Sequence, residues 1–502
     1  MSTLSDLLPA GSGGKQVDFV ADGSINKGQT VALKTDGKVE PISSASYNNE
    51  FQNQYYTTNL GSGYTNTRNI APVWDSSAGL LVAAALGGGN IKIFGASESG
   101  TIGSNYSLNM GAGQSAYTVS SGSGLQGLAY HATAERVVVM LSDASYQNLY
   151  AYPIDVASNG TMTIGSQVTV DTGSNLEDGK LIYDPVNQYL IAIFRNNGVS
   201  KYATMSINAG AITVNALQNI GIGTITDTDF KYLQQTGQVG LAYLDGNNSS
   251  YPTAVIGTMS GTTVSWGTAQ QVESSGTNPR IAQDNNGKIG YVIVESGGLA
   301  KGYAGTLTGN NVSFGSSSTI YNPQNETRPA MYFDTNAKKF VVGADTGLAP
   351  YAYVWLGTIS GTTFSWVQNQ YTMRANSGNT HIRSTCGFFA PEAASGTGTG
   401  FFYWLNDGSG TYYMGVSYAR PAYTINLNEN FIGIADSAIA NTATGSVTIK
   451  GGIATNTSLP TLTPNSVYYV QGDGTISTTS TSPAVRIGKA LSSTSINLEF
   501  NS

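Results

Sequence analysis

Six polar side chains recur at equivalent places in the sequence and could act together on one ligand. Each stands at or just after the end of a short apolar stretch, and the six are Asp143, Asn196, Asp245, Glu295, Asp345 and Asp407. Carboxylate and amide oxygens coordinate hard cations and accept hydrogen bonds from sugar hydroxyls. If the apolar stretches are equivalent strands, the six side chains open on one face and form a candidate ligand site. The alternative is that each one caps its own hairpin turn.

Residues that commonly perform catalysis are scarce. The chain has two histidines, His131 and His381, and one cysteine, Cys386, so neither a zinc site nor an internal disulfide is expected. No nucleophile elbow, zinc-protease motif, phosphate-binding loop or dinucleotide fingerprint occurs in a supporting context. The pair Asp227 and Asp229 gives only weak support for calcium. We therefore expect no enzyme activity, no cofactor and no bound metal.

The candidate residues belong to a repeat with a period near 50 residues. Its apolar stretches are apolar on both faces, which is typical of a strand covered on each side by neighbouring sheets. Successive stretches begin 49 to 60 residues apart. They start at Leu80, Arg136, Tyr189, Gln238, Lys288, Lys339 and Thr399.

A turn precedes each apolar stretch, and a hairpin follows it. The turn often carries Asp, as at Asp75 and Asp184, and His131 takes that position in one copy, which favours a structural role for this histidine. The hairpin has the pattern GTMSGTTVSW in residues 257–266 and GTISGTTFSW in residues 357–366. Each repeat is therefore four short antiparallel strands. Seven repeats in series predict an all-β fold, a seven-bladed β-propeller.

The two ends of the chain predict how the ring closes. Residues 52–55 repeat the tetrapeptide QNQY of residues 368–371, which lies where the sixth repeat has its outer strand. Residues about 50–58 are thus predicted to supply the outer strand of the last blade, which leaves no large gap in the ring.

The terminal segments match no repeat, and the first is too short to bury a core of its own. We predict that residues 1–45 and 425–502 form one small β-barrel or sandwich module. The propeller, residues 46–424, is then inserted into this module.

Composition excludes several classes of protein. Charged residues make up 11% of the chain, and 23 Lys and Arg stand against 30 Asp and Glu, for a net charge of −7. A mainly helical fold is excluded because strong helix formers are few. Nucleic acid is not an expected partner, since no basic patch occurs. Membrane insertion and a signal peptide are not expected either, because no apolar run is long enough and the first residues lack a basic start.

The repeats and the terminal segments resemble structural proteins of tailed bacteriophages. The strand, turn and GTxSGTTxSWG pattern is similar to propeller repeats in such proteins. The segments FIGIA (431–435), YYVQ (468–471) and GKALS (488–492) resemble a small β-module of tail-fibre and head-decoration proteins, and residues 28–39 resemble its first hairpins.

The resemblance implies a virion protein that assembles in the host cytoplasm. It would be a tail-fibre or receptor-binding component whose propeller loops contact a host surface glycan or protein without catalysis. The terminal module would contact other virion proteins, and a homo-oligomer is compatible with this role. Two alternatives stay open, a capsid decoration or head-fibre protein and a glycan depolymerase.

Overall fold

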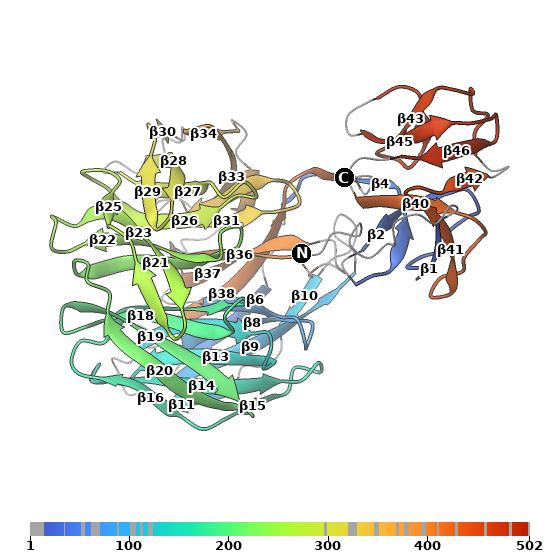
Figure 1. Cartoon of the computed structure of the whole chain (residues 1–502). Helices are drawn as coiled ribbons and strands as arrows, with labels where there is room; N and C mark the ends of the chain where they lie inside the picture. The colour runs from blue at the N-terminus through green and yellow to red at the C-terminus, as the bar shows by residue number, and fades with distance from the viewer. Residues whose placement is uncertain are drawn as a thin grey trace. The chain divides into compact units, whose positions relative to one another are not determined.

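The structure is a computed structural model, shown in Figure 1. It describes residues 15–34, 36–51, 56–61, 71–87, 90–100, 107–110, 114–118, 124–295, 299–319, 329–345, 351–367, 371–375, 381–391, 393, 398–408, 411–426, 430–455, 459–480 and 484–499. Strands joined by turns make up this part of the chain, which contains no α-helix. In these ranges there is accordingly no helix with the length and apolar character needed to cross a membrane.

The chain divides into two compact units. One unit consists of Asn48–Pro421, and the other combines Met1–Tyr47 with Ala422–Ser502. The larger unit is therefore inserted between two segments of the smaller one.

Seven antiparallel sheets, here called blades I to VII, form the described part of the larger unit. The first three blades follow one another along the chain. Blade I contains β7 (Ala71–Asp75), β8 (Leu80–Gly87), β9 (Asn90–Ser99), β10 (Ser107–Met110) and β11 (Gln114–Thr118). Blade II contains β12 (Gly124–His131), β13 (Arg136–Ser142), β14 (Asn148–Val156), β15 (Met162–Ile164) and β16 (Val168–Thr172). Blade III contains β17 (Glu177–Asp184), β18 (Tyr189–Asn196), β19 (Val199–Asn208) and β20 (Ala211–Asn219).

The remaining blades repeat this order. Blade IV contains β21 (Ile225–Leu233), β22 (Gln238–Asp245), β23 (Tyr251–Ser260), β24 (Thr263–Trp266) and β25 (Gln270–Gln271). Blade V contains β26 (Thr277–Gln283), β27 (Ile289–Val294), β28 (Ala300–Thr308), β29 (Asn311–Phe314) and β30 (Ser318–Thr319). Blade VI contains β31 (Ala330–Asp334), β32 (Lys339–Asp345), β33 (Tyr351–Ser360), β34 (Thr363–Trp366) and β35 (Tyr371–Ala375). Blade VII contains β36 (His381–Ala390), β37 (Thr399–Gly408) and β38 (Thr411–Arg420), with β5 (Glu50–Phe51) and β6 (Tyr56–Gly61) paired to β38.

The blades form a closed ring. The first strand of each blade contacts the first strand of the next, in the circuit β7, β12, β17, β21, β26, β31 and β36, and β36 returns to β7. These inner strands therefore surround the centre of the ring. The last blade takes its outer strands from the N-terminal side, since β5 and β6 both pair with β38. The prediction of an all-β propeller is confirmed.

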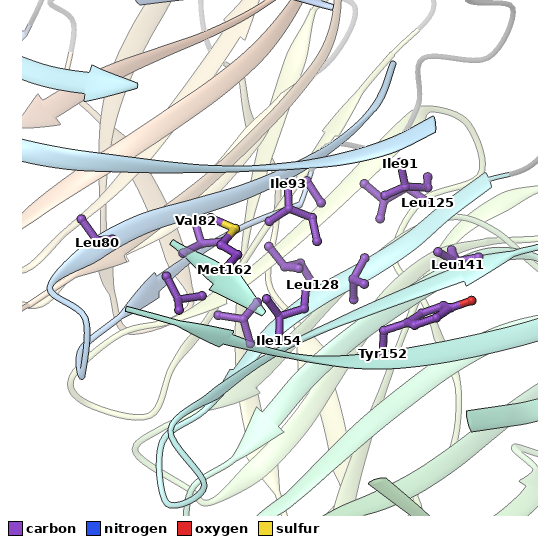
Figure 2. Close-up of a cluster of buried hydrophobic side chains, with 14 of the residues drawn as sticks. Leu80, Val82, Ile91, Ile93, Leu125, Leu128, Leu141, Tyr152, Ile154 and Met162 are labelled. Atoms are coloured by element: carbon purple, nitrogen blue, oxygen red, sulfur yellow. The ribbon is translucent and has the colours of Figure 1, made fainter. Parts of the chain in front are cut away.

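The hydrophobic core lies between neighbouring blades because each sheet is apolar on both faces. Figure 2 shows the packing between blades I and II, where Val82 and Ile93 meet Leu128 and Ile154. Leu128 is 4% exposed, and the other three side chains are fully buried. Each such side chain contributes roughly 1.5–3 kcal/mol relative to its exposed state. Because these stretches are apolar on both faces, each blade packs against its two neighbours, and this packing stabilises the whole ring.

The recurrent SG or TG hairpin makes the two-residue turn that its sequence predicts. Ser260 pairs with Thr263, so Gly261 and Thr262 form the turn between β23 and β24. Gly261 has a φ of 60°, a left-handed conformation that glycine adopts without a steric penalty. Outer strands are usually split into two short strands, whereas β20 of blade III runs unbroken over nine residues.

The smaller unit contains two five-stranded sheets and a short two-stranded ladder. One sheet has the order β1-β41-β40-β2-β3, the other has the order β42-β46-β45-β43-β44, and β4 pairs with β39. Buried Ile434 of the first sheet and Ile487 of the second belong to the same core. The strand bounds are β1 (Gln16–Val20), β2 (Thr30–Leu33), β3 (Val39–Pro41), β4 (Ser44–Tyr47), β39 (Tyr423–Asn426), β40 (Phe431–Ala435), β41 (Thr444–Ile449), β42 (Ile453–Thr455), β43 (Val467–Gln471), β44 (Ile476–Ser477), β45 (Ala484–Ala490) and β46 (Ser495–Leu498).

Candidate functional site

The six side chains singled out in the sequence occupy one kind of position. Each lies at the end of the second strand of its blade or in the hairpin that leads to the third strand, and the six are Asp143, Asn196, Asp245, Glu295, Asp345 and Asp407. Asp345 ends β32 and Asp407 lies near the end of β37, but the side chains of these two residues lie outside the described part of the structure.

Asp143 caps its own hairpin. Its Oδ1 accepts a hydrogen bond from the Gln147 backbone N–H at 2.8 Å, and its Oδ2 accepts one from Asn148 Nδ2 at 2.6 Å. Burial alone would raise the pKa of this carboxyl, but the side-chain bond from Asn148 and several backbone N–H groups outweigh burial and lower the pKa. Asp143 is therefore a charged turn residue whose oxygens already have donors.

Asn196 is buried between blades II and III. Its Nδ2 donates to Asp171 Oδ2 at 2.7 Å, and its Oδ1 accepts the Ser174 N–H at 3.2 Å. Lys201 Nζ also contacts Asp171 Oδ2, at 2.9 Å. A Cβ on Gly173 would lie 2.0 Å from Asn196 Oδ1, so this glycine makes room for the amide. Asn196 thus joins two blades.

Asp245 and Glu295 are likewise held within their surroundings. Asp245 Oδ1 accepts the Asn247 N–H at 3.0 Å, and Glu295 Oε1 pairs with Lys301 Nζ at 2.6 Å. No hydrogen bond or ion pair joins any two of the four hairpin side chains that the structure describes. Nor do the described His, Cys, Asp and Glu residues contain a group of three or more that could hold a metal ion.

The turns that join the first and second strands lie at the other end of each blade. There too, Asp side chains accept backbone hydrogen bonds. Asp184 Oδ1 accepts the backbone N–H groups of Val186 and Asn187 at 2.9 and 3.1 Å. In blade II, His131 Nδ1 replaces the carboxylate and accepts the Ala134 N–H at 3.1 Å. His131 Nε2 lies 3.1 Å from Gln188 O, which is an acceptor, so this nitrogen carries the proton. Burial lowers the pKa of His131, and its role is structural.

A different group of charged side chains gathers where the inner strands begin, at the same end of the blades as the six hairpin residues. The pairing of first and second strands breaks register near this point in β12, β17, β21 and β26. The first residue paired after the break is Lys180 in blade III, Asp229 in blade IV and Arg280 in blade V. These three residues therefore occupy equivalent positions on successive inner strands, which contact one another.

The residues at the break itself adopt an uncommon backbone conformation. Asp178, Asp227 and Asn278 have φ values of 54°, 46° and 53°. Bulges with left-handed residues re-aim side chains, and they are over-represented beside functional sites. We call Asp178, Lys180, Asp227, Asp229 and Arg280 the inner-strand cluster.

Hydrogen bonds across the blades fix three members of this cluster. Asp227 Oδ2 accepts the Asn278 N–H at 2.8 Å, and Asp229 Oδ2 accepts the Ile281 N–H at 3.0 Å. Arg280 Nε donates to Pro329 O at 2.7 Å, which links blade V to blade VI. The cluster is thereby held by the backbones of neighbouring blades.

The carboxylates of the cluster also have cationic partners. Arg195 Nη2 lies 2.9 Å from Asp178 Oδ2, and Arg280 Nη1 lies 3.5 Å from Asp227 Oδ1. Lys231 Nζ lies 3.6 Å from Asp229 Oδ1. The pair Asp227 and Asp229 therefore meets backbone N–H groups and protein cations, an arrangement that does not favour calcium.

Lys180 differs from the other members of the cluster. No hydrogen bond or ion pair joins its ammonium to any residue of the described ranges. The residue is half-buried, and burial, followed by the charge of Arg280, lowers the pKa of Lys180 against the opposing effect of Asp229, Asp178 and Asp227. Shifted pKa values occur at binding sites and also in structural networks of charges.

Sequence reasoning missed most of this cluster. Asp227 and Asp229 stood out as a pair, but Lys180 and Arg280 did not, because they lie on different repeats and have no common motif. The usable signal was positional, since each lies at the start of the strand that precedes an apolar stretch. Only alignment of the repeats by their inner strands brings the charged positions into register.

The geometry defines the larger unit as a seven-bladed β-propeller with a charged inner-strand cluster at one end. No protein-family model matches the chain, and no curated protein matches it. Solved structures similar to it include a putative 6-phosphogluconolactonase from Bacteroides uniformis, with 11% identity over 71% of this chain and 96% of that chain and a TM-score of 0.44. A protein from Lactobacillus plantarum has 12% identity over 80% and 99% of the two chains and a TM-score of 0.43. SapL1 lectin in complex with α-methyl fucoside has 10% identity over 63% and 97%, with a TM-score of 0.40.

Proposed function

We propose that this chain is a structural protein of a tailed-bacteriophage virion, a tail-fibre or receptor-binding component. Its propeller would contact a host surface glycan or protein without catalysis. The smaller unit would contact other virion proteins or further copies of the chain. The protein would assemble in the host cytoplasm and act on the particle.

One observation carries the binding part of this proposal. The half-buried residue Lys180 has no hydrogen-bond or ion-pair partner among the described residues, and the other members of the inner-strand cluster are held by neighbouring blades. A preformed polar site on a rigid scaffold loses little conformational freedom when it binds a ligand. The virion part of the proposal rests on the resemblance of the repeats and of the terminal segments to phage proteins.

The non-catalytic part is supported by the state of the hairpin carboxylates. Glycoside hydrolysis uses a pair of carboxyl groups on either side of the scissile bond. Asp143 and Asp245 accept backbone hydrogen bonds within their own turns, and Glu295 is paired with Lys301. These three carboxylates therefore support a scaffold role.

Binding of the purified, fluorescently labelled chain to host cells tests the proposal. We expect saturable binding that exceeds the binding of a labelled control protein of similar size and charge. Absence of binding above this control would contradict the receptor-binding role. Immunogold labelling of intact virions locates the protein, and label on the head would favour the capsid decoration alternative.

The same cell-binding experiment addresses the enzyme alternative. Host polysaccharide incubated with the chain should show no increase in reducing ends. An increase would establish a depolymerase and overturn the non-catalytic proposal.

A further inference from the structure

Three polar side chains of blades II and III meet at one oxygen atom. Asp171 Oδ2 accepts a hydrogen bond from Asn196 Nδ2 at 2.7 Å and another from Lys201 Nζ at 2.9 Å. Asp171 lies on β16 of blade II, Asn196 ends β18 of blade III, and Lys201 lies on the next strand, β19. An amine and a carboxamide therefore contact the same carboxylate. These are the groups that can form an amide bond between two side chains.

The meeting point of these side chains is largely shielded from water. Asn196 is 7% exposed, Asp171 is 8% exposed, and Lys201 is half-buried. Val170, next to Asp171, and Phe194, which pairs with Lys201, belong to the apolar core between blades II and III. Exclusion of water strengthens the electrostatic contacts among reacting groups and suppresses competing hydrolysis.

The Asn196 carboxamide is held in one orientation. Its Oδ1 accepts the Ser174 N–H at 3.2 Å, and its Nδ2 donates to Thr172 O at 3.2 Å. A Cβ on Gly173 would lie 2.0–2.5 Å from the atoms of the carboxamide, so the backbone packs tightly against this group. A backbone N–H at the carbonyl oxygen stabilises the negative charge that develops there when a nucleophile adds to the carbon.

Asp171 is fixed where it can carry protons between the two nitrogen atoms. Its Oδ1 accepts the Thr172 N–H at 2.8 Å, while its Oδ2 contacts Asn196 and Lys201. A carboxylate that contacts both an attacking and a leaving nitrogen can act as general base toward the first and as general acid toward the second. The three side chains are also positioned by the fold itself, which makes their reaction unimolecular.

We propose that Lys201 and Asn196 form an intramolecular amide bond, with Asp171 as the catalytic residue. The Lys201 ammonium gives a proton to Asp171 Oδ2, and the electron pair of Nζ attacks Cγ of Asn196. The Nζ–Cγ bond forms, Nδ2 takes the proton from Asp171, and the Cγ–Nδ2 bond breaks to release ammonia. Ammonia takes the second proton that Nζ loses and departs as ammonium. One ammonium and one carboxamide thus become a secondary amide and an ammonium ion, with no cofactor or oxidant.

Blade V provides an internal comparison that lacks the carboxamide. Glu295 and Lys301 occupy the positions of Asn196 and Lys201, and their side chains form an ion pair at 2.6 Å. An ionised carboxylate resists attack by an amine because it already carries negative charge. We therefore expect an amide bond in blade III and none in blade V, and Lys301 is the matched control for Lys201. This inference is independent of the proposed receptor-binding function.

Intact-mass spectrometry of the purified full chain tests the proposal, with each mass compared with that of its own sequence. Wild type should be lighter by about 17 Da, because the reaction releases one ammonia. Lys201→Arg keeps a positive charge beside Asp171 but cannot form this bond, so it should have the full mass of its sequence. Lys301→Arg should show the same loss as wild type. Asp171→Asn removes the proton carrier and should retain the full mass.

Peptide mapping of wild type locates the bond. Trypsin does not cleave after an acylated lysine, so one peptide should contain Asn196 and Lys201 and carry the loss of ammonia. This peptide should resist hydroxylamine, which attacks a succinimide formed by Asn197 and Gly198. Cleavage of the light peptide by hydroxylamine would assign the loss to that succinimide and overturn the proposal.

Three further outcomes overturn the proposal, namely a full mass for wild type, persistence of the loss in Lys201→Arg, or its disappearance in Lys301→Arg. An undiminished loss in Asp171→Asn would overturn the catalytic role of Asp171. The mass and the peptide map of wild type decide even if a variant does not fold.

Discussion

At the scale of single residues, several aspartates of this propeller join backbone segments. Asp143 and Asp184 accept backbone N–H groups within their own turns, and Asp227 and Asp229 accept N–H groups of the next blade. A carboxylate with such donors is stabilised in its charged form. Within the inner-strand cluster, Lys180 is the member whose charged group has no hydrogen-bond or ion-pair partner among the described residues. We can therefore predict the sign of the change in the free energy of unfolding when this ammonium is removed.

We predict that Lys180→Met raises the free energy of unfolding of the unliganded protein, by about 1 kcal/mol. The physical reason is that a half-buried ammonium without a hydrogen-bonded counter-ion is replaced by an apolar side chain of similar length. Chemical denaturation at neutral pH measures the change. Lys201→Met, in the same blade, is the matched control, because the replacement there breaks an ion pair with Asp171 and should lower stability. A loss of stability in Lys180→Met would show that the ammonium has a stabilising partner.

A second residue-scale prediction concerns Asp334, in the turn of blade VI. Its Oδ1 accepts the N–H groups of Asn336 and Ala337 at 3.0 and 2.8 Å, while its buried Oδ2 has no hydrogen-bond partner. Burial raises the pKa of this carboxyl from 3.8 to about 6. The folded protein therefore holds the proton more tightly than the unfolded chain, and Asp334 costs stability as the pH rises from 4 to above 6.

Asp334→Asn should remove this pH-dependent cost. The stability of the variant relative to wild type should increase between pH 4 and pH 7, by up to about 3 kcal/mol. Denaturant unfolding at a series of pH values measures the difference. Asp184→Asn is the control, because Asp184 Oδ2 accepts a hydrogen bond from Asn187 Nδ2 at 2.8 Å and no such gain is expected there. A flat difference curve for Asp334→Asn would contradict the prediction.

At the scale of strands and turns, neighbouring blades fit together through small residues and short polar side chains. Gly173 follows β16 of blade II and lies against Asn196 at the end of β18 of blade III. The amide of Asn196 is fixed by Asp171 and Ser174, so it cannot move aside without breaking hydrogen bonds. The close approach of the Asn196 amide therefore requires glycine at position 173.

We predict that Gly173→Ala destabilises the propeller by about 1–3 kcal/mol, because the new Cβ would overlap the Asn196 amide. The double variant Gly173→Ala with Asn196→Ala should recover much of this loss relative to Asn196→Ala alone. Thermal or denaturant unfolding of the four proteins in the cycle gives the coupling energy. Additive losses would mean that the two residues do not interact.

At the scale of the whole molecule, the ring depends on a segment from the far end of the unit's sequence. β6 pairs with β38 from Tyr56 to Gly61. Phe51 of β5 stacks on Tyr371 of blade VI, with 4.3 Å between the ring centroids. These contacts complete the last blade. Propellers that lack such closure expose a sheet edge, which is a site of aggregation.

We predict that residues 48–421, expressed alone, fold and unfold cooperatively, because they contain every strand of the seven described blades. Residues 71–421 serve as the matched comparison, since they lack β5 and β6 but keep all other blade strands. This shorter chain should unfold at a lower temperature and aggregate more readily. Circular dichroism melts and size-exclusion chromatography measure both effects, and equal melting of the two chains would contradict the role of the closing strands.

Much of the fold was predictable from local pattern. Stretches that are apolar on both faces, such as Arg136–Ser142, can be recognised from fewer than ten consecutive residues. The same holds for the SG turn, where Gly261 supplies the left-handed residue. Repetition of these units fixed the number of blades. The structural role of His131 was also predictable, because the equivalent position in other repeats holds a turn aspartate.

The candidate site was less accessible to sequence reasoning. The sequence predicted a recurrent polar position after each second strand but left open whether those side chains bind a ligand or cap turns. It gave no reason to single out Lys180, whose surroundings come from Asp227, Asp229 and Arg280 on two other blades.

By itself, then, the amino-acid sequence determined the all-β repeat, its number and its turns, because these depend on residues close together along the chain. Tertiary structure alone decided which of the charges are paired. Electrostatic environment depends on distance in space, and the bulges of β17, β21 and β26 set those distances only when the ring is closed.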